Sequence, residues 1–199
     1  NGVRGDLRSV VRAVLFDPEV WDGTHLTNPN WGKAKEPIVK VATLLRALDC
    51  KAPSKVFQLQ SIQSDDYDIG QMPLMANSVF NFFQPDFAPA GEIAAAGLTG
   101  PEFQVINNNT LIGFMNFTHY LLDYGLYGGD DQNTLNCDFT KYAGLAGDGT
   151  ALAKALARDL MGVPLQAAVE QSIAATVQTI PASNAQGRVK AALMMLTAS

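Results

Sequence analysis

Residues 109–124, NTLIGFMNFTHYLLDY, decide the fold class, because their apolar side chains return every three or four positions. That period is typical of an α-helix with one buried face and differs from the alternation of a strand. The glycines of the following run, LDYGLYGGDD, end the helix. The predicted buried face consists of Leu111, Phe114, Met115, Thr118 and Leu122.

The same period predicts two helices earlier in the chain. The first covers residues 7–15, and Asp6 stands where a side chain can cap its first turn. The second covers residues 36–48 with Pro37 in its first turn, a position that tolerates proline. The run KVFQLQ at 55–60 alternates like a strand, but a lone strand would have no partner, so it is left outside the predicted elements.

Three further helices are predicted in the last quarter of the chain. Thr150 and Ser183 are suited to be N-caps, and Pro164 is suited to a first turn. With the helices before them, they predict an all-α protein, an irregular helical bundle of about six helices in a single domain over residues 1–199. The three ranges are 150–161, 164–178 and 185–198.

Two long segments without a predicted helix, 65–101 and 124–149, lie between these helices, and we call them the first and the second excursion. The first contains too many aromatic residues for a disordered segment, since they would all be exposed to water. It is therefore predicted to be an ordered loop that wraps across the bundle, whereas the second is polar enough for a surface loop. The aromatic residues in and just after the first excursion are Phe80, Phe82, Phe83, Phe87 and Phe103.

The composition excludes two classes of partner. The 199 residues carry a net charge of -5, and their basic residues are scattered, which argues against nucleic acid because phosphate binding needs clustered lysine and arginine. No apolar run reaches the 18 or more residues of a membrane span. No cofactor is predicted, because no phosphate-cradling glycine loop precedes a helix.

The two cysteines, Cys50 and Cys137, fit neither a zinc pattern nor a CxxC redox motif, because both require close spacing. Two interpretations remain. A disulfide across this separation would stabilise the fold by about 4 kcal/mol in the chain-entropy model. The alternative is two buried free thiols, since cysteine is a good core residue.

No catalytic constellation is visible in the sequence. His25 and His119 are far apart, and His119 lies in an apolar helix, where a hydrogen-bonded core imidazole is the expected environment. There is no GxSxG elbow. Two acidic runs could hold calcium, but neither has the EF-hand spacing, so solvated turns are expected and no metal is predicted. The runs are Asp65, Asp66 and Asp68, and Asp130 and Asp131.

Amides and aromatic rings interleave in the first excursion, which makes it the candidate binding segment. Buried amides must be hydrogen-bonded, so their expected role is to hold an irregular backbone. The functional alternative is a carbohydrate or peptide groove, in which rings stack on apolar faces and amides contact hydroxyl groups. The candidate binding residues are Gln71, Asn77, Phe80, Asn81, Phe83 and Phe87.

Five blocks of the chain carry a resemblance to a known family. They are VRGDLRSVVRAVLFDP, KEPIVKVATLLRAL, GQMPLMANSVFNFFQPDFAPAG, GLTGPEFQ and RVKAALMMLTAS. In order and spacing they resemble the C-terminal part of a large bacterial family catalogued as a domain of unknown function, number 1800. The resemblance implies an exported, extracytoplasmic, mainly helical protein that is longer than this chain and often encoded beside a sulfatase-like family. It also implies that the family's candidates for chemistry lie in an N-terminal part with no counterpart here.

These observations predict a structural or binding component of an exported or cell-surface bacterial assembly, non-catalytic in this fragment. Residues 69–104 would form its main interface with the remainder of its own precursor or with a partner chain, as suits a segment rich in aromatic residues. One alternative is part of an extracellular hydrolase whose active site lies mainly in a missing N-terminal portion. The other is a carbohydrate-binding module, with a polysaccharide as ligand.

Overall fold

The computed structural model describes residues 2–28, 31–57, 62 and 67–197, apart from the side chains of residues 26 and 27. The chain divides into two compact units, Asn1–Ala34 and Lys35–Ser199, which are described separately. Within the described residues the regular structure is helical, and the β-type pairings there are isolated bridges. The predicted all-α fold is therefore confirmed. Of the run KVFQLQ at 55–60, the last three residues lie outside the described part of the chain.

The first unit contains α1 (Leu7–Leu15), α2 (Pro18–Trp21) and the 3₁₀ helix η1 (Gly23–Thr27). Asp6 caps α1 as predicted, because its Oδ1 accepts the Ser9 N–H at 3.2 Å. The Trp21 indole N–H donates to the Leu15 carbonyl at 2.7 Å and so joins the end of α2 to the end of α1. No residue of α1 is buried.

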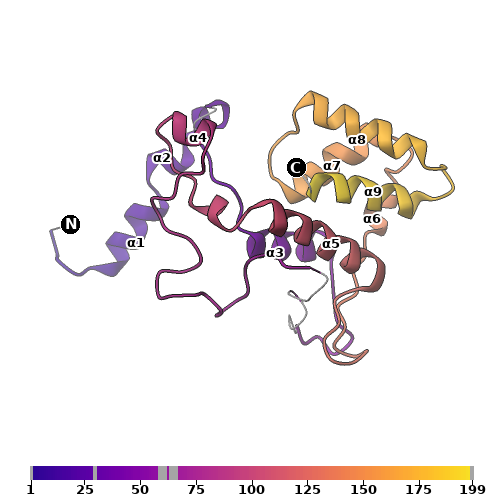
Figure 1. Cartoon of the computed structure of the whole chain (residues 1–199), viewed down its shortest axis with the longest axis horizontal. Coiled ribbons are helices and arrows are strands. Elements are labelled where there is room, and N and C mark those ends of the chain that lie inside the picture. Colours follow the sequence, from indigo (N-terminus) through magenta and orange to yellow (C-terminus); the bar gives the residue numbers. More distant parts are fainter. Residues whose placement is uncertain (1, 29–30, 58–61, 63–66, 198–199) are drawn as a thin grey trace. The chain divides into compact units, whose positions relative to one another are not determined.

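The second unit contains the remaining helices (Figure 1). Among the described residues, the helices of nine or more residues are α1, α3, α5, α7, α8 and α9, which correspond to the six predicted ones. Short helices fall inside both predicted excursions. In chain order the second unit has α3 (Pro37–Ala47), α4 (Glu92–Ala95), η2 (Pro101–Gln104), α5 (Asn108–Tyr124), α6 (Thr140–Ala143), α7 (Gly149–Leu160), α8 (Ala167–Thr179) and α9 (Ala185–Thr197).

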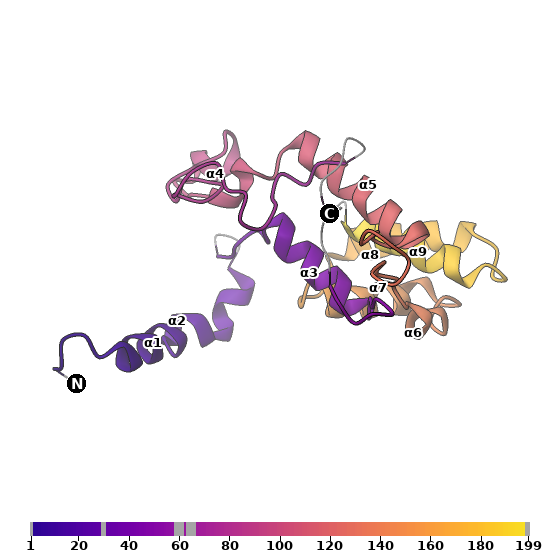
Figure 2. The ribbon, with the colours of Figure 1, turned by 90° about the horizontal axis from the view of Figure 1, so that it is seen from below.

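The last three helices pack against one another, and both ribbon views show them side by side (Figures 1 and 2). Their contacts are close because α7 begins with Gly149, where a Cβ atom would stand 2.8 Å from the Cα of Ala174 in α8. Burial of their large apolar side chains supplies most of the stabilisation here. The fully buried residues are Leu152, Leu156, Ile173, Val177, Val189 and Leu193.

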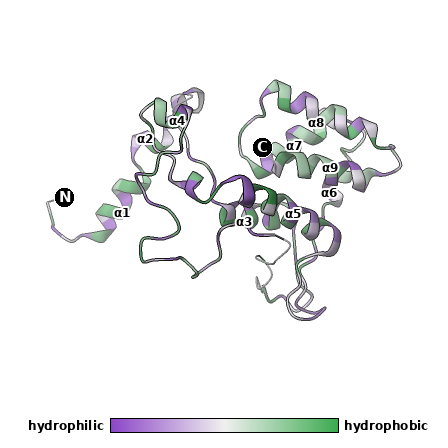
Figure 3. Cartoon of the chain, in the orientation of Figure 1, coloured by the Kyte–Doolittle hydropathy of each residue, from purple (hydrophilic) through white to green (hydrophobic). Residues whose placement is uncertain are grey.

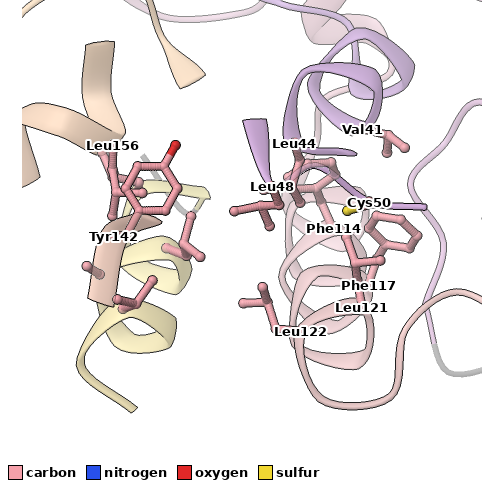
Figure 4. Close-up of a cluster of buried hydrophobic side chains, with 14 of the residues drawn as sticks. Val41, Leu44, Leu48, Cys50, Phe114, Phe117, Leu121, Leu122, Tyr142 and Leu156 are labelled. Carbon is pink, nitrogen blue, oxygen red and sulfur yellow. The ribbon is translucent and has the colours of Figure 1, made fainter. Parts of the chain in front are cut away.

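A second layer of the same core forms between α3 and α5 (Figure 4). The α5 face differs slightly from the predicted one, because Phe117 and Leu121 are buried while Leu111 and Met115 are only half-buried. Gly113 of α5 lies directly against the backbone of Asp68. The other buried side chains of this layer are Val41, Leu44, Leu48, Phe114 and Leu122.

The Sγ atoms of Cys50 and Cys137 are bonded in the structure, at 1.95 Å. The bond joins Cys50, the third residue after α3, to the second excursion. The polar stretch of that excursion also pairs with the chain after α3 through the Lys51–Asn136 bridge. Leu126 and Leu135 pair with each other inside that excursion and are both fully buried. The second excursion is therefore joined to the core by a disulfide, a backbone bridge and two buried leucines, whereas a surface loop was predicted.

Three predicted helix starts are wrong by one to three residues. Asp148, not Thr150, caps α7, since its Oδ1 accepts the N–H groups of Thr150 and Ala151. Pro164 lies outside α8, which begins at Ala167. Asn184 takes the place predicted for Ser183, and its Oδ1 accepts the Gly187 N–H at 2.9 Å. In α7 and α9 a neighbouring Asp or Asn makes the capping hydrogen bond in place of the predicted residue, whereas α8 begins without a side-chain cap.

Arg188 is buried at the start of α9 and joins three segments of the C-terminal helices. Its Nε donates to the carbonyl of Ile180, and its Nη1 donates to the carbonyl of Ala146, both at 2.8 Å. A guanidinium presents several donors in a fixed plane, so one side chain can satisfy carbonyl groups from two directions. Arg188 is therefore a structural residue.

Hydrogen bonds to one carboxylate, that of Asp159, join α6 to α7. The Tyr142 hydroxyl donates to Asp159 Oδ2 at 2.8 Å, Lys141 Nζ lies 3.2 Å from the same atom, and Arg158 Nε donates to Oδ1 at 3.0 Å. Burial raises the pKa of Asp159, but the hydrogen bonds from Tyr142, Arg158 and Lys141 outweigh it and hold the pKa below its usual value. Burial likewise raises the pKa of Tyr142.

The lowered pKa of Asp159 predicts a loss of stability in acid. A carboxyl group with a lowered pKa in the folded state stabilises above its unfolded pKa of about 3.9, and this contribution disappears as the pH falls through the folded pKa. The stability difference between the wild type and Asp159→Asn should therefore narrow as the pH falls from about 5 to about 2. Urea unfolding across that range measures it. Tyr142→Phe should show part of the same narrowing, whereas a difference that does not vary with pH would contradict the assignment.

Candidate interaction surface on the first excursion and α3

The first excursion is anchored where it begins by Gln71, which is buried. The Gln71 Oε1 accepts the N–H of Ile38 at 3.1 Å, and its Nε2 donates to Glu36 Oε2 at 2.7 Å. Glu36 occupies the N-cap position of α3 without making a capping hydrogen bond. Gln71 thus supplies the cap that the helix lacks locally, because the first N–H groups of a helix have no intrahelical acceptor.

Gln71→Ala is expected to lower the free energy of unfolding by about 2 kcal/mol, because it leaves the partly buried Ile38 N–H without its acceptor and removes a donor from Glu36. Urea unfolding followed by circular dichroism measures the change. Gln84→Ala is the matched control, since Gln84 contributes its backbone N–H to a hydrogen bond with Gln104 Oε1, at 2.8 Å, that the substitution preserves. Equal losses in the two variants would contradict the capping role.

After Gln71 the excursion turns outward instead of covering the bundle. Phe80 is 78% exposed and Phe103 is 37% exposed, so the predicted wrap across the core is wrong for these two rings. The other three predicted aromatic residues, Phe82, Phe83 and Phe87, are half-buried. The aliphatic side chains around them are also in water, and residues 73–80 include exposed Leu74, Met75, Val79 and Phe80.

The reason is that tight local turns satisfy much of this backbone. Met75 N–H donates to the Met72 carbonyl, and Ser78 pairs with Asn81 in an isolated bridge. Leu74 and Asn81 adopt left-handed backbone conformations, with φ of 63° and 73°. A backbone that closes its own hydrogen bonds within a few residues does not need to pack against the core. We call residues 73–80 the apolar loop.

The remaining candidate amides stay within the excursion. Asn77 and Asn81 are exposed, and Asn81 serves a turn through its backbone. The far end of the segment is closed by the Gly100 N–H, which donates to the Phe87 carbonyl at 2.8 Å. The predicted binding residues therefore separate into one buried anchor, Gln71, three exposed residues and two half-buried rings. The exposed residues are Asn77, Phe80 and Asn81, and the half-buried rings are Phe83 and Phe87.

The outer face of α3 carries a groove of about 540 Å³ that reaches the apolar loop at Pro73. Sequence reasoning missed it, although the half-buried Ile38 and Leu45 stand two helical turns apart on α3 and so lie on one side of the helix. None of the six candidate binding residues lines the groove. Its apolar lining is formed by Ile38, Val41, Ala42, Leu45, Cys50, Phe57 and Pro73, and its polar lining is formed by Arg46, Asp49 and Lys51.

The structure places the two histidines in different units, His25 in the first and His119 on α5 in the second. His119 was expected in the core, but its side chain is 65% exposed and its Nδ1 lies 3.1 Å from Asp123 Oδ2. The pKa of Asp123 is lowered, chiefly by a hydrogen bond from Lys190. His25 belongs to the first unit, where its ring stacks on Trp31 with centroids 4.1 Å apart.

One carboxylate of each acidic run serves a turn. Asp68 Oδ1 accepts the N–H of Gly70, and Asp130 accepts from both the backbone and the side chain of Asn133. Asp65 and Asp66 lie outside the described residues. Within the described ranges, no group of three or more histidine, cysteine or acidic residues is arranged to hold a metal ion.

Comparison with known proteins identifies a family. No helix in the described part of the chain is both long enough and apolar enough to cross a membrane. No curated protein and no solved structure matches the chain. The family model described as protein of unknown function, DUF1800, matches residues 1–199, the whole chain. The resemblance of the five sequence blocks is confirmed, and the chain belongs to the DUF1800 family.

Proposed function

We propose that this chain is a non-catalytic binding component of an exported or cell-surface assembly, and that its apolar loop docks onto another polypeptide. The observation that carries the proposal is Leu74, whose side chain is fully exposed on a left-handed backbone. The left-handed conformation destabilises the folded state by about 1–2 kcal/mol at a residue with a Cβ atom. No burial of the leucine side chain offsets this strain, because the side chain faces water. Such strain is typical of a functional position.

The neighbours of Leu74 support the same conclusion. Met75, Val79 and Phe80 are each more than 60% exposed, so the apolar loop presents several large side chains together. The loop meets the α3 groove at Pro73, which extends the apolar surface over the side of the helix. Contiguous apolar surface of this kind is typical of protein interfaces.

The chemistry of the loop favours a polypeptide over a sugar. Carbohydrates bind through stacking on aromatic rings together with convergent hydrogen-bonding groups, whereas Leu74, Met75 and Val79 are aliphatic or thioether side chains. The buried amide of Gln71 is committed to α3, so it is not available to contact hydroxyl groups. The partner surface is therefore the remainder of the precursor or a separate chain with a complementary apolar pocket.

Site-specific photocross-linking tests the proposal in cells of the source organism. A benzoylphenylalanine at position 79 should form a cross-link to one discrete polypeptide, which mass spectrometry then identifies. The matched control places the same group at Thr179, an exposed position at the end of α8. The cross-link should disappear in a Leu74→Asp variant and persist in Gln84→Ala. A chain that remains monomeric by native mass spectrometry and yields no discrete cross-link would overturn the proposal.

A further inference from the structure

The apolar stripe of α1 is a second surface without a partner in its own unit. Every large apolar side chain of the helix is between 54% and 75% exposed, and Figure 3 shows hydrophobic and hydrophilic bands side by side along it. Phe16, directly after the helix, is exposed as well. The stripe consists of Leu7, Val10, Val11, Val14 and Leu15.

The length of α1 makes this exposure informative. The helix has nine residues, and isolated helices shorter than about 12–15 residues are marginal in water even with good helix formers. Val10, Val11 and Val14 are β-branched and lower its intrinsic propensity further. Its cap at Asp6 adds a hydrogen bond to the Ser9 N–H, which does not by itself make so short a helix stable. A stable α1 therefore requires another surface against its stripe.

The charges beside the stripe indicate what that surface carries. Arg8 and Arg12 are four residues apart on α1, so they follow one edge of the stripe. No carboxylate in the described residues forms an ion pair with either of them, and the Arg12 guanidinium stacks over the Phe16 ring at 5.3 Å. Asp6, the nearest acidic residue, already accepts hydrogen bonds from the backbone and the hydroxyl of Ser9.

From this arrangement we propose that α1 docks against an acidic amphipathic helix of a protein partner. The apolar stripes of the two helices meet, and carboxylates on the partner pair with Arg8 and Arg12 along one edge, as charged edge positions do in coiled coils. This surface and its partner chemistry differ from those of the apolar loop, so the two proposals stand independently.

Two other occupants fit less well. An anionic membrane surface would attract the arginines, but it would repel the carboxylates of Asp17, Glu19 and Asp22 that surround the exposed Trp21 directly after α1. A second copy of α1 supplies no free carboxylate for the arginine edge, since the Asp6 of each copy caps its own helix. The charge pattern therefore selects a partner with an acidic edge.

Two synthetic three-heptad helices test the inference with the intact chain. Both have leucine at the a and d positions; one has glutamate at e and g, and the other has lysine there. Fluorescence anisotropy should show that the glutamate peptide binds at least about tenfold more tightly than the lysine peptide and that the difference shrinks in high salt. The double variant Arg8→Glu and Arg12→Glu should reverse the preference, and the double lysine variant should retain it.

A variant of the apolar loop and hydrogen exchange provide the controls for this experiment. Leu74→Asp should leave the preference unchanged, which separates this surface from the apolar loop. Hydrogen exchange should show α1 amides that are unprotected in the free chain and become protected with the glutamate peptide. The inference is overturned by equal binding of both peptides, by binding of neither, by tighter binding to phosphatidylglycerol vesicles than to the glutamate peptide, or by α1 amides already protected in the free chain.

Discussion

Reduction of the Cys50–Cys137 disulfide is expected to lower the free energy of unfolding by about 4 kcal/mol. The bond joins residues separated by 87 positions, and the entropy that a cross-link removes from the unfolded chain grows with the logarithm of the loop it closes. Reduction should leave most of the packing around Cys50 in place, because Cys50 is buried among apolar residues and a thiol fits the same space. The loss should therefore arise mainly in the unfolded state.

Urea unfolding of the native and the reduced protein measures this loss as a shift of the transition midpoint. The double variant Cys50→Ala and Cys137→Ala should reproduce the reduced value and should no longer respond to dithiothreitol. Peptide mapping without reductant identifies the linked pair directly. Free thiols at both positions, or a midpoint that dithiothreitol does not shift, would contradict the role of the bond.

Gly113→Ala is expected to destabilise the fold by about 3 kcal/mol, the upper part of the range for overpacked cores. A Cβ at Gly113 would stand 2.0 Å from the carbonyl oxygen of Asp68 and 2.7 Å from its carbonyl carbon. Backbone atoms cannot rotate away as a side chain can, so the segment before Gln71 would have to move off α5. That movement also strains the Gln71 hydrogen bonds to the start of α3.

Gly144→Ala is the matched control for Gly113→Ala. A Cβ at Gly144 meets no atom within 4 Å, and its backbone is right-handed, with φ of −63°. The alanine there should be neutral or slightly stabilising, because it restricts the unfolded chain. Thermal unfolding of both variants separates the effect of close packing from the general effect of replacing glycine. A Gly113→Ala variant as stable as the control would show that α5 does not approach Asp68 this closely.

The long helices could be predicted from the sequence because their signals are local. The apolar period of α1 and its Asp6 cap lie within one short segment, so the helix could be located without knowledge of any distant contact. His119 shows how a local signal can be misread. It directly follows the fully buried Thr118, and one step along a helix turns the next side chain by about 100° away from the core.

The candidate surface could not be predicted because it depends on contacts between distant residues. Gln71 caps a helix that begins 34 residues earlier in the chain, at Pro37, and nothing near Gln71 in the sequence indicates that role. The outward course of the apolar loop depends on the left-handed backbone at Leu74. Steric clashes make that conformation uncommon for leucine, so the sequence gives no reason to expect it there. The aromatic residues of the first excursion predicted that it would be buried. In the structure, its backbone forms local turns instead, and the Phe80 ring is exposed to water.

One amide connects the apolar loop to the framework of the protein. Because the Ile38 N–H has the Gln71 side chain as its acceptor, its hydrogen can exchange with solvent only when that side chain has withdrawn. The exchange rate of this single proton therefore reports how often the Gln71 side chain, at the base of the loop, separates from the start of α3. A ligand on the loop that steadies its base would slow the exchange, and a ligand that pulls the base away would accelerate it, so Ile38 is a built-in probe of the surface.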